Sequence, residues 1–141
     1  EVRLDGAVDL PGVNADANQI QQIVINLITN SLEAIGPEKG SITVRTGVEE
    51  CDERRLSANA AEDSQCVPGR FVFLEVADTG CGIDEVDRKH LFEPFYTTRF
   101  LGRGLGLPAI LGIVRSVMGA IFVVSAPGTG TTFQVLLPVG E

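Results

Sequence analysis

One stretch of the sequence, Gln19 to Ile35, constrains the fold more than any other, because it is the longest uninterrupted helical pattern in the chain. At about 100° per residue, most of its apolar side chains fall on one broad side of a helix, namely Ile20, Ile23, Val24, Leu27, Ile28, Ala34 and Ile35. Asn26, Asn30 and Glu33 lie at positions i, i+4 and i+7 and form a narrow polar stripe on a different side. Asparagine is a mediocre helix former. The stripe is therefore either a solvated face that happens to carry amides or a surface with a function.

The length and composition are those of a single globular domain over residues 1–141, with 44% hydrophobic residues and room for a substantial core. No apolar run reaches the roughly 18 residues needed to span a bilayer, and no signal-peptide pattern opens the chain. The sequence begins with Glu1 rather than Met. We therefore expect a piece of a longer cytoplasmic protein, and whether that parent is anchored in the inner membrane stays open.

Charge and cysteine usage argue against two kinds of site. A formal net charge of −8 makes nucleic acid an unsuitable main partner. The three cysteines form no C-x-x-C motif, and the sequence offers a single histidine as a further ligand. Both facts disfavour a zinc site. A disulfide between Cys51 and Cys66 is conceivable, although three scattered cysteines are more typical of a reduced cytosolic protein.

The order of the expected elements predicts the fold class. Alternating or apolar runs predict strands at Val2–Val8, Ser41–Val48, Arg70–Ala77, Ile121–Ser125 and Thr131–Leu137. Helices are expected from a cap at Asn14 or Asp16 to Gly36-Pro37, within Asp84–Leu91, and at Pro108–Met118. This order is typical of an α/β (α+β) two-layer sandwich, with about three helices over a mixed, mostly antiparallel sheet of about five strands.

The segment Glu49–Gly69 differs from the rest because it carries many charges and almost no large apolar residue. Such a composition predicts a long solvated loop or a mobile hairpin tip between two strands. We expect it to have no role in chemistry.

Asp78 ends an apolar strand and is followed by Gly80 and Gly82. An acid leaving a buried strand is costly unless it is paired or solvated, and the glycines allow a tight turn and a close approach of a flat ligand. A carboxylate there can accept from the amine of an adenine-like base. The alternative is an Asx turn that closes the strand.

A second candidate is the glycine-rich run Gly102–Gly106, which precedes a helix. Free backbone N–H groups and the helix start attract phosphate, although a flexible hinge is the alternative. The run is neither a Walker A loop nor a Rossmann fingerprint. The third candidate is the stripe of Asn26 and Asn30, whose amide oxygens suit Mg²⁺.

Taken together, these motifs resemble the ATP-binding catalytic domain of two-component sensor histidine kinases. The wider superfamily (GHKL, with the Bergerat-type ATP-binding fold) includes gyrase, Hsp90 and MutL. The resemblance covers nearly the whole chain. The matching motifs are Asn26–Ser31 (N box), Asp78–Ile83 (G1 box), Phe92–Phe95 (F box), Gly102–Leu107 (G2 box), and Gly128–Phe133 followed by Leu137-Pro138. Small departures are Ser31 in place of Ala, Tyr96 in place of Phe, and Pro108 after the G2 motif.

The resemblance implies roles for individual residues. Asn26 and Asn30 would be catalytic, with Asn30 the Mg²⁺ ligand and Asn26 beside the phosphates. Asp78 would bind the adenine amino group, helped by Thr131 or Thr132. Residues 84–104 would form an ATP lid, and which of its arginines meets a phosphate stays open. The remaining expected ATP contacts are Glu33, Gly80, Gly82, Ile83, Phe95, Thr97, Thr98, Arg99, Arg103, Gly104, Leu105, Gly106 and Leu107.

The resemblance also implies a reaction and its partners. A histidine kinase transfers the γ-phosphoryl group of Mg-ATP to a histidine on a separate dimerisation domain, from which a response regulator receiver domain takes it. That acceptor domain is absent here, because the single histidine, His90, falls within the expected lid. We expect the isolated domain to be monomeric and the parent to be a homodimer.

Two other functions stay open. ATP-hydrolysing relatives carry a general-base Glu at the place of Asn26, and an amide cannot accept a proton at neutral pH. Glu33, almost two turns away, is a weak substitute. The third hypothesis is a module that binds nucleotide or a partner without catalysis.

Overall fold

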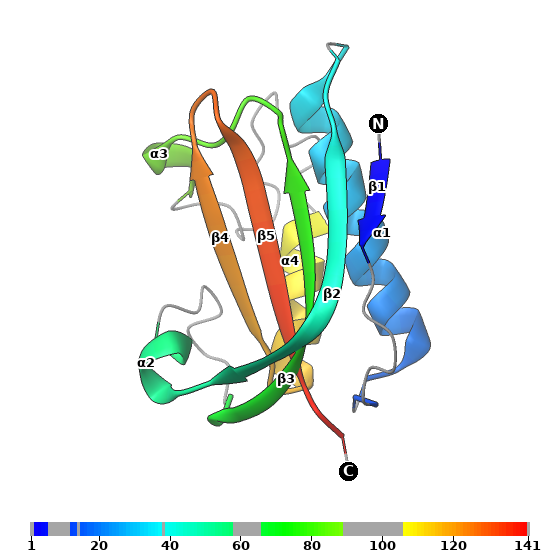
Figure 1. Cartoon of the computed structure of the whole chain (residues 1–141), viewed down its shortest axis with the longest axis vertical. Coiled ribbons are helices and arrows are strands. Elements are labelled where there is room, and N and C mark those ends of the chain that lie inside the picture. Colours follow the sequence, from blue (N-terminus) through cyan, green and yellow to red (C-terminus); the bar gives the residue numbers. More distant parts are fainter. Residues whose placement is uncertain are drawn as a thin grey trace.

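The computed structural model describes residues 2–5, 12–13, 15–37, 39–57, 66–88 and 106–140. In this part of the chain, two long helices cover one face of a five-stranded sheet (Figure 1). The elements are β1 (Val2–Asp5), α1 (Ala17–Ile35), β2 (Ile42–Cys51), α2 (Glu53–Leu56), β3 (Gly69–Asp78), α3 (Glu85–Arg88), α4 (Gly106–Ser116), β4 (Ala120–Ala126) and β5 (Gly130–Pro138).

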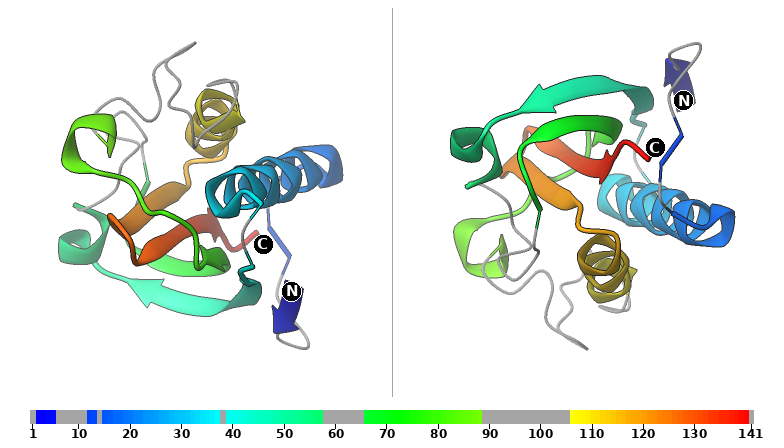
Figure 2. Two further views of the ribbon diagram at one scale, coloured as in Figure 1. Left: turned by 90° about the horizontal axis from the view of Figure 1, so that it is seen from above. Right: turned by 90° about the horizontal axis from the view of Figure 1, so that it is seen from below.

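The sheet has the strand order β1-β2-β3-β5-β4. β1 pairs with β2 in parallel, and the other three pairs are antiparallel. The two long helices, α1 and α4, lie together on one side of the sheet, which we call the inner face (Figure 2). The predicted two-layer sandwich with a mixed, mostly antiparallel sheet is thereby confirmed.

Helix α1 begins and ends where its sequence predicts. Asp16, the second of the two expected caps, accepts a hydrogen bond from the Asn18 N–H at 2.8 Å. In return, its own N–H donates to Gln19 Oε1 at 3.0 Å, which completes a capping box. The helix ends at Gly36, whose φ of 64° favours glycine.

The main core lies between the sheet and the two long helices. Apolar side chains from α1, α4 and the inner faces of four strands form one cluster. Its buried members are Ile23, Leu27, Ile42, Leu74, Val76, Ile83, Leu107, Ile110, Leu111, Val114, Ile121, Val123, Phe133, Val135 and Leu137. None of the described helices is long and apolar enough to cross a bilayer.

The prediction of a solvated loop at 49–69 is wrong for its first part. β2 continues to Cys51, and α2 folds back over the outer face of the sheet. Cys51 is 5% exposed and Leu56 is 8% exposed, so both belong to a packed layer. This second cluster contains Cys51, Leu56, Phe71, Ala120, Phe122 and Leu136. Residues 58–65 of the predicted loop lie outside the described residues.

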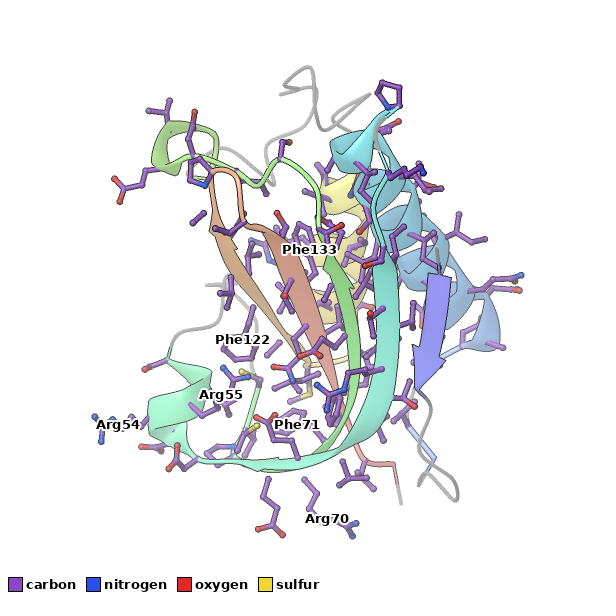
Figure 3. All side chains as sticks on the ribbon, turned by 45° about the horizontal axis from the view of Figure 1, so that its top comes forward. Arg54, Arg55, Arg70, Phe71, Phe122 and Phe133 are labelled. Atoms are coloured by element: carbon purple, nitrogen blue, oxygen red, sulfur yellow. The ribbon has the colours of Figure 1, made fainter. Side chains whose placement is uncertain are left out.

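Arg55 connects α2 to the sheet. Its Nε donates to Glu49 Oε2 at 3.0 Å, and its Nη2 donates to Gln134 Oε1. The guanidinium also lies 3.8 Å from the centroid of the Phe122 ring, which is a cation–π contact. Figure 3 shows Arg55 directed toward Phe122, whereas the neighbouring Arg54 points away from the protein. Polar and cation–π contacts therefore hold a segment whose apolar content is low.

Cys51 takes part in the same network. All three cysteines are free thiols in the structure. The Cys51 thiol donates to Glu49 Oε2 at 3.2 Å. Burial raises the pKa of this thiol, and the Glu49 carboxylate raises it further, to about 12. For Glu49, burial acts to raise the pKa, but the hydrogen bonds from Arg55, Cys51 and Gln134 outweigh it and lower the pKa.

We predict that Arg55→Ala lowers the free energy of unfolding by about 1–2 kcal/mol, because it removes two hydrogen bonds and a cation–π contact. Arg54→Ala is the matched control in the same helix and should change it by less than about 0.5 kcal/mol. Urea unfolding measures both. An equal loss in the two variants would mean that α2 itself, and not the Arg55 network, is responsible.

We predict that Cys51 is the slowest cysteine to react with iodoacetamide at pH 8. A pKa raised from 9.0 to about 12 leaves roughly a thousandfold less reactive thiolate. Cys66 and Cys81 are only partly buried. Mass spectrometry of timed samples follows each site, with the urea-unfolded chain as control. Modification of Cys51 as fast as Cys66 in the folded chain would contradict this.

Candidate functional site

The site is organised around the carboxylate of Asp78, the last residue of β3. Asp78 is 7% exposed and lies on the inner face with Leu74 and Val76, as alternation along the strand requires. Its Oδ1 accepts from the Gly80 N–H at 2.9 Å and from the Thr131 N–H at 3.2 Å. Among the described residues, none donates a hydrogen bond to Oδ2. The Asx turn is thus present, and it leaves one carboxylate oxygen for a ligand.

Two hydroxyl groups extend this arrangement onto β4 and β5. Ser125 Oγ lies 2.8 Å from Thr131 Oγ1 and donates to the Gly130 carbonyl at 3.0 Å. It also accepts from the Ile83 N–H at 2.8 Å. Ser125 was not among the expected site residues. It is a polar residue near the C-terminal end of an apolar strand, which is the same signal that identified Asp78.

The register of β5 separates the two candidate threonines. Thr131 pairs with Asp78, and Thr132 pairs with Ala77. Because successive side chains point to opposite faces of a sheet, Thr131 shares the inner face with Asp78 and Thr132 lies on the outer face. The structure therefore brings only Thr131 to this end of the site.

Gly80 and Gly82 allow the segment after β3 to pass close to other backbone. A Cβ on Gly82, whose φ is 75°, would lie 2.0 Å from the Ala126 carbonyl oxygen. A Cβ on Gly80 would lie 2.8 Å from the carbonyl carbon of Ala34. The expected tight turn is present, but the close approach in the structure is to protein backbone.

Backbone hydrogen bonds fix the same segment from three directions. The Thr79 N–H donates to the Ser41 carbonyl at 3.1 Å, and the Cys81 N–H donates to the Ala34 carbonyl at 3.3 Å. The Gly128 N–H, in the turn between β4 and β5, donates to the Cys81 carbonyl at 2.7 Å. These hydrogen bonds therefore fix the backbone that follows Asp78.

The polar stripe of α1 lies along the edge of its buried face. Asn30 is 7% exposed, and its Nδ2 has no hydrogen-bond partner within the described part of the chain. Asn26 is half-buried and Glu33 is exposed. The stripe is thus not a uniformly solvated face, because its central amide is buried.

The donor set around Asn30 fits a magnesium ion bound mainly by phosphate and water. No group of three or more His, Cys, Asp or Glu side chains suited to a metal occurs in the described ranges. Mg²⁺ does not need such a group, because it keeps several waters and takes one or two protein oxygens plus substrate phosphates. The two ends of an amide exchange by rotation, so the unpartnered edge of Asn30 can present its oxygen.

Gly106 and Leu107 open α4, two residues earlier than predicted, and Pro108 falls in the first turn, where its missing N–H is tolerated. Leu107 and Ile83 belong to the main core, so only their edges are open to a ligand.

Seven expected contact residues lie outside the described residues, as does the lid beyond Arg88. They are Phe95, Thr97, Thr98, Arg99, Arg103, Gly104 and Leu105.

A hollow of about 530 Å³ lies beside the C-terminal end of α1. Its lining includes Glu33 and Gly80 but not Asn30 or Asp78. The buried polar groups and this hollow are therefore different places, and we assign the chemistry to the buried groups because they carry the unpartnered atoms.

Comparison with known proteins identifies the family. Residues 15–141 match the model of the histidine kinase-, DNA gyrase B- and HSP90-like ATPases. The sensor kinase CckA of Brucella abortus (strain 2308) is 38% identical over 98% of this chain and 14% of its own length. The signal transduction histidine-protein kinase AtoS of Escherichia coli (strain K12) is 34% identical over 93% of this chain and 18% of its own length. The chain thus spans less than a fifth of either relative.

Solved structures agree with this match. Full-length ShkA in complex with AMPPNP superposes with a TM-score of 0.74 at 25% identity, over 100% of this chain and 26% of that one. The catalytic domain of histidine kinase ThkA superposes with a TM-score of 0.71 at 27% identity, over 100% of this chain and 81% of that one. By sequence and by fold, the chain belongs to the histidine kinase-, DNA gyrase B- and HSP90-like ATPase family, as an ATP-binding catalytic domain of the sensor histidine kinase type.

Proposed function

We propose that this chain binds Mg-ATP and presents the γ-phosphoryl group for transfer to a histidine on a separate dimerisation domain of the same parent protein. The observation that carries the proposal is the buried Asp78 carboxylate. Two backbone N–H groups hold its Oδ1, and Oδ2 stays available on the face covered by α1.

The carboxylate selects the base. An ionised Asp is only an acceptor of hydrogen bonds, so it favours a 6-amino purine over a 6-oxo purine, whose oxygen it would repel. Thr131 and the Gly80 N–H fix the direction of the carboxylate. The base therefore meets an acceptor that cannot rotate away.

The amide side chains of the stripe on α1 would bind the phosphates and their Mg²⁺. Phosphoryl transfer asks a protein mainly for positioning and charge neutralisation. Asn30 would hold Mg²⁺, which neutralises phosphate charge when it is bound, and Asn26 would lie beside the phosphates. Gly104, Gly106 and either Arg99 or Arg103 would complete this end.

Asn26 favours transfer over hydrolysis. Hydrolysis needs a general base that removes a proton from water, and an amide cannot do so at neutral pH. Glu33 is exposed on α1, almost two turns beyond Asn26. The stripe therefore suits ATP held for another acceptor.

The partners follow from the reaction. We infer a cytoplasmic two-component pathway in which the dimerisation domain supplies the histidine and a response regulator receiver domain takes the phosphoryl group. The named relatives are sensor kinases several times longer than this chain, which supports further domains in the parent. The parent would be a homodimer and the isolated chain a monomer.

Phosphotransfer from γ-labelled ATP tests the proposed function directly. The chain, Mg²⁺ and the histidine-bearing domain of the parent are mixed, and acid-labile label on that domain is the expected result. Steady release of free phosphate by the chain alone, lost in Glu33→Gln, would support hydrolysis instead. ATP binding with neither result would leave a nucleotide-binding module.

We predict that Asp78→Asn costs on the order of 1–3 kcal/mol of ATP affinity, because the amide replaces a charged acceptor. Calorimetry with ATP measures the change. Asp16→Asn is the matched control, since it makes the same substitution at a helix cap that Asn satisfies equally well. Unchanged ATP affinity in Asp78→Asn would refute the role of Asp78 in binding the base.

We predict that Asn30→Ala lowers Mg²⁺-dependent phosphotransfer on the order of 100-fold while the fold stays intact, because it removes a fixed group at the transferring phosphate. Asn18→Ala, an exposed position of the same helix, is the control and should retain full transfer. Circular dichroism checks the fold of both. Full transfer by Asn30→Ala would contradict the metal role.

A further inference from the structure

Two segments of the chain meet at the hydroxyl of Ser125, which lies near the C-terminal end of β4. One is the start of β5, where Thr131 lies opposite Ser125 and, on its other side, opposite Asp78 of β3. The other is the segment after β3, whose Ile83 N–H donates to Ser125 Oγ. Figure 1 shows these ends of the three strands at the same end of the sheet. Directly opposed residues of antiparallel strands share a face, so the three side chains lie together on the inner face.

The contacts of this hydroxyl use its full hydrogen-bonding capacity. A serine hydroxyl donates one proton and accepts at two lone pairs. Ser125 donates its proton to the Gly130 carbonyl at 3.0 Å, because a carbonyl oxygen only accepts. One lone pair accepts from the Ile83 N–H at 2.8 Å. The contact of 2.8 Å with Thr131 Oγ1 therefore completes the set only if the Thr131 hydroxyl is the donor.

This direction fixes the chemical character of Thr131. The residue is 4% exposed, and among the described residues Ser125 is the hydrogen-bond partner of its hydroxyl. With its proton directed to Ser125, Thr131 Oγ1 offers only lone pairs to a ligand. The neighbouring carboxylate of Asp78 also only accepts. These two side chains therefore present acceptors to the site and no donor.

An apolar residue would suit position 125 as far as packing is concerned. Ile121 and Val123 precede it on the inner face and belong to the main core, and valine would continue that pattern. It would, however, leave the Ile83 N–H and the Thr131 proton without their acceptor. A threonine hydroxyl without such a partner rotates to suit its surroundings and either donates or accepts. The serine thus decides what Thr131 presents to a ligand.

We propose that Ser125 is a positioning residue that makes Thr131 a pure acceptor and thereby strengthens the selection of a 6-amino purine. This inference rests on the proposed function and extends it to a residue that acts through another. The exocyclic amine of a 6-amino purine brings protons to a set of acceptors. The oxygen at the same place in a 6-oxo purine is itself an acceptor, and a rotating Thr131 hydroxyl would accommodate it by donating. Ser125 removes that accommodation.

Displacement of a bound fluorescent ATP analogue by ATP or by ITP, the 6-oxo counterpart of ATP, tests the proposal. The 141-residue chain should bind ATP more tightly than ITP, and Ser125→Ala should lower this preference about three- to tenfold. Ser125→Thr keeps the hydroxyl and should retain the preference. Thr129→Ala is the matched control, because it removes a hydroxyl of the same β4–β5 turn that donates to the Ala126 carbonyl. It should leave the preference unchanged.

The ratio of the two affinities separates this role from a structural one. Loss of the acceptor for the Ile83 N–H would weaken both nucleotides alike, so equal weakening in Ser125→Ala would overturn the proposal, as would an unchanged ratio. Circular dichroism checks the fold. If Ser125→Ala does not fold, Ser125→Cys replaces it, because a thiol has a similar shape and is a weak hydrogen-bonding group. A full ATP preference in Ser125→Cys would then overturn the proposal.

Failure of the proposed function has a different signature. If the unsubstituted chain displaced the analogue with neither nucleotide, the proposed function would fail and this inference with it. If ATP binds and Asp78→Asn weakens it, while Ser125→Ala keeps the full preference for ATP, only the role of Ser125 is overturned.

Discussion

The site depends on the burial of one carboxylate at the end of a central strand. Leaving an ionised acid in an apolar setting is costly unless its lone pairs are satisfied. The Gly80 and Thr131 N–H groups satisfy Oδ1 of Asp78, and this requires a tight turn after β3 and the pairing of β5 with β3. Gly82 then lets the same segment pass against the turn between β4 and β5. The turn after β3 and the pairing of β5 with β3 thus both contribute to holding this one acid.

Periodicity predicted most of the fold because α1 and the paired strands bury one face each. Capping and stop signals around Asp16 and Gly36 were sufficient to place the ends of α1. The prediction of a solvated loop failed at α2 for a physical reason. Arg55 contacts Glu49, Gln134 and Phe122 and so holds this segment against the sheet. Such contacts leave no hydrophobic pattern in the sequence, so a charged segment that packs against a sheet looks like a loop.

The site was predicted as a set of residue types more than as an arrangement. Asp78 stood out as an acid at the end of an apolar strand, and Asn30 as one of two mediocre helix formers one turn apart, and both are buried. The choice between Thr131 and Thr132 depends on strand register, which a single sequence does not contain. Ser125 gave the same signal as Asp78, but the glycines that follow its strand, Gly128 and Gly130, join two strands and predict a turn. Residue type thus identifies candidates, and pairing between distant strands decides which of them meet.

The two ends of the site have different physical requirements. At the base end, backbone and buried hydrogen bonds favour one arrangement of acceptor atoms. At the phosphate end, the proposed reaction moves the phosphoryl group to a separate domain of the same parent, so no group near the phosphates should activate water. Under the proposed function, the amide of Asn26 would meet that requirement, whereas a carboxylate in the same place would supply a general base. In this proposal the same base pocket would suit either reaction, and the residue at position 26 of α1 would favour transfer.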